Sequence, residues 1–140
     1  MGARSSARQA ALQMLFAAEA SGEPASVVIA DFWRELPGDA DDRKYADLAV
    51  TGVLDKLAEL DELITRASAN WRLERMTRIS RNVLRLGTWE LLEQPESPRA
   101  VVLDESVDLA KRFGTKDAGA FVNGVLDRVA DECKRVDGDR

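Results

Sequence analysis

An arginine-rich stretch is the part of this sequence whose residue types are best suited to binding an anion. Residues 66–86 contain six arginines and a single acid, Glu74, although the chain of 140 residues has a formal net charge of −5. Residues 17–65, by contrast, contain four basic and twelve acidic residues. A guanidinium is planar and can make two parallel hydrogen bonds to a phosphate or a carboxylate. Because charge is segregated along the chain, we expect one face of the protein to attract a polyanion such as a nucleic acid. The six arginines are Arg66, Arg72, Arg75, Arg78, Arg81 and Arg85.

Four of these arginines are spaced by three, three and four residues, which places them near one stripe of a helix. Like charges at this spacing repel one another. The stripe therefore needs either carboxylates from neighbouring helices or an external anion, and the sequence leaves both interpretations open. Arg85 lies between the apolar Leu84 and Leu86, so we expect it to have a structural role.

Two further regions carry side chains that could contact a polyanion. Arg4 and Arg8 lie at the start of the chain, with no acid before Glu19, and the amides of a helix that begins there would also face anions. Near the other end, Phe121 precedes Asn123, and an exposed ring at that position could stack on an unpaired base. Packing of Phe121 in the core is the alternative. Gly124 follows inside an apolar helical pattern, so we expect a close helix crossing or a ligand backbone to lie against it.

The composition excludes most catalytic machinery. The chain has no histidine and one cysteine, Cys133, which rules out His-based nucleophile systems, zinc sites built from His and Cys, and an intramolecular disulfide. The aspartates 39, 41 and 42 lack the spacing of a calcium loop and are better explained as helix-starting residues. Asp104 and Asp108 have Lys111 and Arg112 as nearby partners, so we expect surface ion pairs there. We therefore predict a non-enzymatic protein without metal or cofactor, located in the cytoplasm, and no apolar run is long enough to span a membrane.

The secondary-structure elements that position these residues are all expected to be helices. Apolar residues recur at intervals of three and four, and the alternation typical of strands is absent. Glycine and proline fall at the expected helix ends. Residues 41–67 are predicted to form one long helix, and residues 136–140 a frayed tail. The predicted helices cover residues 6–20, 28–36, 41–67, 77–92, 102–113 and 121–133.

Four motifs, taken in order, resemble the NusB family of bacterial transcription antitermination factors. They are Ala7-Arg8 with Ala11-Leu-Gln-Met-Leu-Phe16, Val83-Leu-Arg-Leu-Gly-Thr-Trp-Glu-Leu91, Asp104-Glu-Ser-Val-Asp-Leu-Ala-Lys-Arg-Phe-Gly114, and Phe121-Val-Asn-Gly-Val-Leu-Asp127. The resemblance implies an all-α fold with about six to seven helices. These would form two small three-helix bundles, packed roughly perpendicular within a single domain spanning 1–140. The N-terminal bundle would cover about 5–68 and the C-terminal bundle about 72–135.

The same resemblance implies that the protein pairs with the ribosomal protein NusE and binds boxA-type RNA to promote processive rRNA transcription in the elongation complex. The RNA-binding positions would be Arg4, Arg8, Lys116, Asp117, Phe121 and Asn123, and contacts could extend to Arg72 and Arg75 because the family's run of adjacent arginines is thinned here. The NusE-binding positions would be Phe16, where the family has tyrosine, Ser80 and its neighbour Arg78. The free protein could form a homodimer. The alternative is a helical protein-protein interaction module without direct RNA binding. A similar module occurs fused to RNA methyltransferases, but this chain lacks the glycine-rich strand-loop-helix that such catalysis needs.

Overall fold

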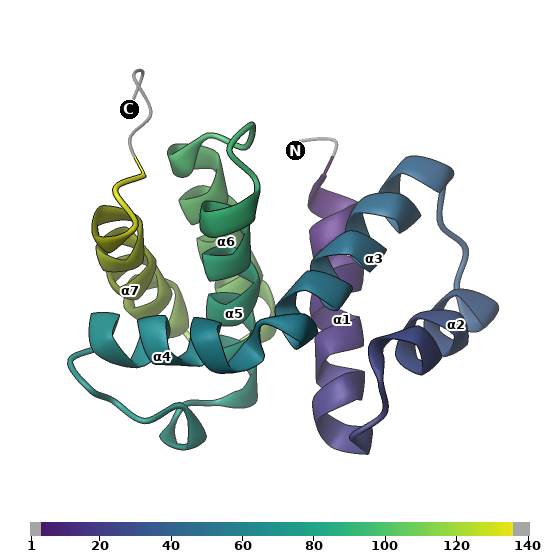
Figure 1. Ribbon diagram of the computed structural model, residues 1–140, viewed down its shortest axis with the longest axis horizontal. Helices are drawn as coiled ribbons and strands as arrows, with labels where there is room; N and C mark the ends of the chain where they lie inside the picture. Colours follow the sequence, from purple (N-terminus) through teal and green to yellow (C-terminus); the bar gives the residue numbers. More distant parts are fainter. Residues whose placement is uncertain (1–3, 136–140) are drawn as a thin grey trace. The chain divides into compact units, whose positions relative to one another are not determined.

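The computed structural model describes residues 4–135, which form seven α-helices and one short 3-10 helix, with no strand among them (Figure 1). This confirms the predicted all-α class. The expected tail at 136–140 lies outside the described residues. The elements are α1 (Ser5–Ser21), α2 (Ala25–Glu35), α3 (Ala40–Asp55), α4 (Leu57–Ala67), η1 (Leu73–Arg75), α5 (Arg78–Glu93), α6 (Arg99–Phe113) and α7 (Ala118–Glu132).

The predicted long helix over 41–67 is wrong, because the chain leaves helical geometry at Lys56 (φ −113°, ψ 23°). The two resulting helices belong to different compact units, one ending at Asp55 and the other beginning at Lys56. The buried side chains of α3 pack on α1, whereas those of α4 contact α5 and α7. A continuous apolar pattern in the sequence therefore covers two helices with separate cores. This division differs from the expected bundle boundary near 68–72, and the perpendicular packing of the bundles stays a prediction.

The first unit is built on the packing of α1 against α3, with α2 beside both. The contact face of α1 is rich in alanine, and Leu12, Met14 and Leu15 fill the remaining space. Small side chains allow two helix backbones to approach closely. Helix α1 ends where Gly22 adopts a left-handed conformation (φ 73°) and donates its amide to the Ala18 carbonyl at 2.8 Å.

The second unit surrounds α5, which contacts α4, α6 and α7. Figure 1 shows α4 running across the direction of α5, α6 and α7. Helix α5 begins at the N-cap residue Thr77, whose hydroxyl accepts a hydrogen bond from the Ser80 amide at 3.1 Å. A close helix crossing lies at Gly87, where an added Cβ would meet Leu126 Cδ1 at 2.8 Å and Ser106 Oγ at 2.9 Å. The core side chains of this unit are Leu60, Ile64, Val83, Leu84, Leu86, Trp89, Val102, Leu103, Val122, Val125, Leu126 and Val129.

The close crossing expected at Gly124 is absent. A Cβ at that position would meet only the Arg128 guanidinium, at 3.8 Å or more. The apolar pattern around Gly124 identifies the helix correctly, but the glycine itself lies toward the outer side of α7. The other interpretation, approach of a ligand backbone, stays a prediction.

Candidate nucleic-acid interface

A cavity of about 310 Å³ opens in the second unit where α5 and α7 begin. Its lining brings together three of the residues singled out from the sequence: Ser80 in the first turn of α5, Asp117 at the N-cap of α7, and Phe121 in the first turn of α7. These positions are about forty residues apart in the sequence and meet because both helices start at the same end of the unit. The other lining residues are Trp71, Thr77, Thr115 and Ala118.

Two aromatic rings line this cavity and stay accessible to solvent. Phe121 is 36% exposed, so the alternative of Phe121 as a plain core residue is wrong. Trp71 is 53% exposed and was missed among the sequence candidates. The signal that could have found it was the tripeptide Asn70-Trp71-Arg72, which places a large aromatic residue between two helical patterns and beside the arginine block.

The segment before Trp71 has an unusual backbone. Ala69 (φ 56°) and Asn70 (φ 64°) both adopt the left-handed conformation, which for a residue such as Ala69 costs of order 1–3 kcal/mol. Several hydrogen bonds hold this turn. The Asn70 amide donates to the Thr65 carbonyl at 2.8 Å, and the Trp71 amide donates to the Ser68 carbonyl at 3.1 Å. The Ser68 hydroxyl lies 3.2 Å from the carbonyl oxygens of both Thr65 and Trp71.

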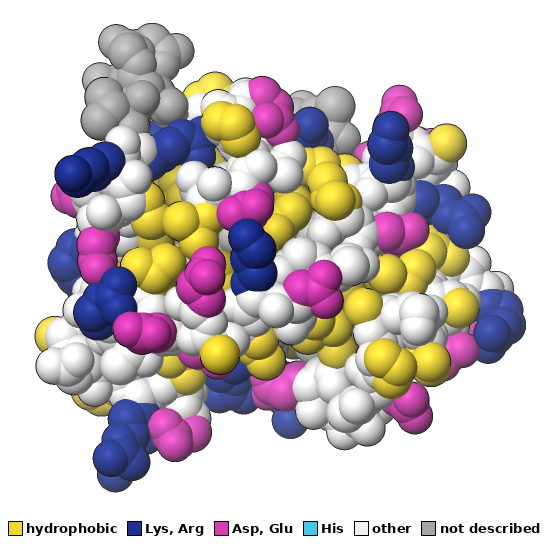
Figure 2. Space-filling model, viewed as in Figure 1, with side chains coloured by type: hydrophobic (Ala, Val, Ile, Leu, Met, Phe, Trp, Pro, Cys, Tyr) yellow, Lys and Arg dark blue, Asp and Glu magenta, His cyan; other side chains and the backbone are white. Residues whose placement is uncertain are grey.

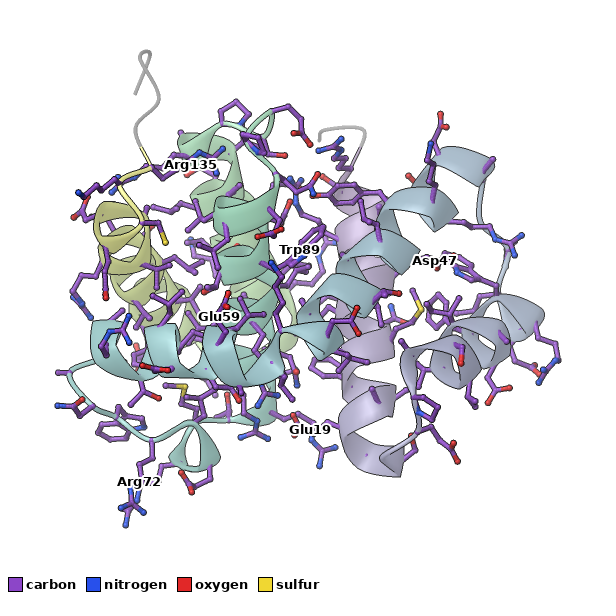
Figure 3. All side chains as sticks on the ribbon, in the orientation of Figure 1. Glu19, Asp47, Glu59, Arg72, Trp89 and Arg135 are labelled. Carbon is purple, nitrogen blue, oxygen red and sulfur yellow. The ribbon has the colours of Figure 1, made fainter. Side chains whose placement is uncertain are left out.

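Two cations of this region, Arg72 and Arg75, follow Trp71 in the sequence. Both are exposed, and among residues 4–135 neither makes an ion pair. Figure 3 shows the Arg72 side chain extending away from the ribbon beside η1. Lys116 is also exposed and lies next to the cavity residues Thr115 and Asp117. The exposed Glu74 offsets part of this positive charge.

Other arginines of the block are used inside the protein, so the intramolecular interpretation holds for part of the stripe, and binding of an external anion stays a prediction for the rest. Arg85 binds Asp61 through two hydrogen bonds of 2.8 and 2.9 Å, which confirms its predicted structural role. Arg81 donates to the carbonyls of Leu73 and Met76 at 3.0 Å and so holds η1 against α5.

Arg66 pairs with the carboxylates of Glu62 and Glu132 at 2.8 Å. The hydrogen bond to Glu132 raises the pKa of Arg66, which therefore stays charged. Arg78 is exposed and also has an intramolecular contact. The expected broad positive face is thus reduced to a small cationic site. On the face shown in Figure 2, Lys and Arg side chains are interspersed with Asp and Glu.

The N-terminal candidates lie in the first unit and are placed differently from the expectation. Arg8 is only 3% exposed and has an intramolecular partner, so its guanidinium cannot reach a phosphate without a rearrangement. Arg4 is partly exposed and stacks on the Tyr45 ring, with Cζ 4.1 Å from the ring centroid. Phe16 is half-buried on α1.

Asn123 is separated from Phe121, although the two residues are close in sequence. Positions two apart on a helix point in nearly opposite directions. Asn123 lines a second groove of about 490 Å³ between α6 and α7, together with Asp104, Asp108 and Lys111. The expected ion pairs from Asp104 and Asp108 to Lys111 and Arg112 are absent from the part of the chain that the structure describes.

Residues 4–135 contain neither a membrane-spanning helix nor a cluster of metal-binding side chains. No helix in this range is long and apolar enough to cross a membrane. No group of three or more His, Cys, Asp or Glu side chains in this range is placed to hold a metal ion.

These features define an all-helical protein whose candidate site combines exposed aromatic rings with exposed basic side chains. Such a site is suited to binding a ligand. The sequence profile of the NusB family matches residues 5–131, and the chain belongs to that family. A Sorangium cellulosum protein described as transcription antitermination protein NusB is 64% identical over the full length of both chains. A transcription antitermination factor is not an enzyme, so the prediction of a non-enzymatic protein is confirmed.

Solved structures show the same fold. The T. maritima NusB structure has a TM-score of 0.84 and 36% identity, covering 94% of this chain and 92% of the other. A second structure, described as antitermination factors NusB and NusE in complex with dsRNA, also has a TM-score of 0.84, with 28% identity, and covers 92% of this chain and 96% of the other.

Proposed function

We propose that this protein is an RNA-binding antitermination factor. It binds boxA-type RNA together with the ribosomal protein NusE, joins the transcription elongation complex in the cytoplasm, and promotes processive rRNA transcription. Membership of the NusB family supports the proposal, as does the similarity to a structure described as a complex of NusB and NusE with RNA.

The single observation that carries RNA binding is the exposed Phe121 ring in a cavity that Trp71 also lines, with the exposed Arg72 next to Trp71 in the sequence. Arg72 and Arg75 attract the phosphates, and the ring accepts an unpaired base by stacking. Lys116 adds charge beside the cavity, while Asp117 offers a carboxylate that can accept a hydrogen bond from a base amino group. Arg8 is left out of this site because of its burial. Arg4 and Asn123 stay candidates for contacts outside the cavity.

The NusE contacts are proposed to involve Phe16, Arg78 and Ser80. Ser80 lines the same cavity as Phe121, so NusE and RNA would contact neighbouring parts of the second unit. Phe16 is half-buried and offers an apolar edge on α1. In the absence of NusE, that edge is the surface we propose for homodimer formation.

A titration of labelled boxA-type RNA, with and without NusE, tests the proposal. NusE should increase the RNA affinity of the wild-type protein. Phe121→Ala should then weaken binding by about tenfold, since base stacking on an aromatic side chain contributes about 1–3 kcal/mol. The variant should unfold at nearly the wild-type temperature, because the ring is partly exposed.

Two results would contradict this assignment. If RNA bound NusE equally well whether or not this protein was present, the protein would be an interaction module without direct RNA contact. If Phe121→Ala instead lost about 3–5 kcal/mol of stability, the ring would belong to the core.

A further inference from the structure

Trp71 has no role in the core that accounts for its position. The other two tryptophans are satisfied within the protein. Trp89 is 3% exposed in the core of the second unit, and the Trp33 indole donates a hydrogen bond to Asp47 Oδ1 at 2.7 Å. More than half of the Trp71 side chain remains in contact with solvent, and no hydrogen bond to its indole N–H is present among residues 4–135. A large exposed ring of this kind is a candidate for ligand binding.

The backbone holds Trp71 in a fixed place. Its amide and its carbonyl both bond to Ser68, which is itself buried. Arg128 of α7 donates its Nε to the Ala67 carbonyl and ties the start of this turn to the helix that carries Phe121. A ring whose backbone is already ordered loses less conformational entropy when a ligand binds.

The surroundings of Trp71 identify the kind of ligand. Trp71 and Phe121 come from different elements and line the same cavity of about 310 Å³. This volume is at the small end of the range for ligand pockets, which favours one planar group over a long chain. Arg72 follows Trp71 directly and Arg75 lies three residues further along the chain, so two exposed cations that make no ion pair within residues 4–135 are close in sequence to this cavity residue. A planar group carried on an anionic backbone matches both features.

We propose that Trp71 forms the second aromatic wall of a pocket for one unstacked nucleobase of the bound RNA. This inference rests on the proposed function and adds to it a residue and a subsite. The base lies between two aromatic surfaces, and the adjoining phosphates contact Arg72 and Arg75. Hydrogen bonds to the base edge come from Thr115 and Asp117, which are among the polar residues of the lining.

Abasic scanning of the RNA tests the pocket through a double-mutant cycle. Single-stranded boxA-type RNAs, each lacking one base, are titrated with wild type, Trp71→Ala and Trp71→Phe in the presence of NusE. In the wild type, removal of one particular base should weaken binding about tenfold or more. In Trp71→Ala the complete RNA should bind about tenfold more weakly, and removing that same base should have a smaller effect than it has in the wild type, because only the stacking on Phe121 is then left to lose. Trp71→Phe should stay within about threefold of the wild type, because it keeps an aromatic face.

Leu48→Ala is the matched control, since Leu48 is 52% exposed and lies on α3 in the first unit. It should leave RNA affinity unchanged. If wild type binds RNA but no abasic position couples to residue 71, the pocket is refuted while the proposed function survives. If Trp71→Ala weakens NusE binding and not RNA binding, the occupant is a protein side chain and the inference is wrong. Absence of RNA binding by wild type in the presence of NusE would overturn both proposals.

Discussion

Replacing Arg72 and Arg75 together by alanine removes two exposed cations that follow the cavity residue Trp71 in the sequence. Both side chains are exposed and make no ion pair within residues 4–135. The double variant should therefore fold normally, with a change in the free energy of unfolding within about 0.5 kcal/mol. Any loss of RNA affinity then reports on the lost contacts.

The size of the effect follows from counterion release. Each phosphate contact on single-stranded nucleic acid contributes about 0.7 to the slope of log K against log salt concentration, so two contacts contribute about 1.4. Between about 50 and about 200 mM salt, this difference corresponds to about sevenfold in affinity. When the salt concentration is raised over this range, the RNA affinity of the wild type should therefore fall about sevenfold more than that of the double variant.

Fluorescence anisotropy of labelled boxA-type RNA at several salt concentrations, with NusE present, measures both slopes. Arg34→Ala is the control, because Arg34 is an exposed arginine of α2 that only pairs with Asp31 on its own helix. Its slope should equal that of the wild type. Parallel slopes for the wild type and the Arg72/Arg75 double variant would refute the assignment of phosphate contacts to these residues.

Three further predictions concern the scaffold. Gly124→Ala should stabilise the protein by about 1 kcal/mol, since the space around this glycine is open. Gly87→Ala should destabilise the protein by about 1–3 kcal/mol, because the added methyl group overpacks the helix crossing. Chemical denaturation measures both changes in the free energy of unfolding. Arg99→Ala should cost about 1–2 kcal/mol in the same assay, because the guanidinium bonds Asp127 Oδ1 at 2.8 Å and Asp131 Oδ1 at 2.9 Å from a mostly buried position. Alkylation of Cys133 at pH 8 should be slower than that of a free cysteine, since burial raises the pKa of the thiol and keeps it protonated, and the rate should increase above pH 9.

Each of these predictions has a result that would contradict it. Equal effects of the two glycine substitutions would mean that the crossing is not at Gly87. An unchanged stability of Arg99→Ala would show that the bonds from α6 to α7 make no net contribution. Alkylation of Cys133 at the rate of a small-molecule thiol would rule out the burial that raises its pKa.

The helical class and most of the second unit's core could be predicted from the sequence, because both depend on local periodicity. Val83, Leu84 and Trp89 recur at helical spacing and are buried as expected. Of the cavity residues, Phe121 was found as an aromatic residue near Asn123 at the start of a helical pattern, and Ser80 through the resemblance to the NusB family. The two meet because α5 and α7 begin at one end of the unit.

The remaining features depend on tertiary contacts that periodicity does not encode. The break at Lys56 is invisible in an apolar pattern that continues on both sides of it. Arg8 is charged and near the terminus, yet its burial is set by neighbours distant in sequence. Trp71 follows two successive left-handed residues, Ala69 and Asn70; asparagine adopts this conformation more readily than most residues, but the alanine gives no sign of it in the sequence.

Amide chemical-shift mapping tests most directly whether RNA occupies the cavity at the start of α5 and α7. Isotope-labelled protein is combined with unlabelled NusE, and boxA-type RNA is then added to saturation. We expect the largest shifts upon RNA addition on residues 71–75 and 115–121. Shifts confined to the groove between α6 and α7, or to residues of the first unit, would contradict this expectation.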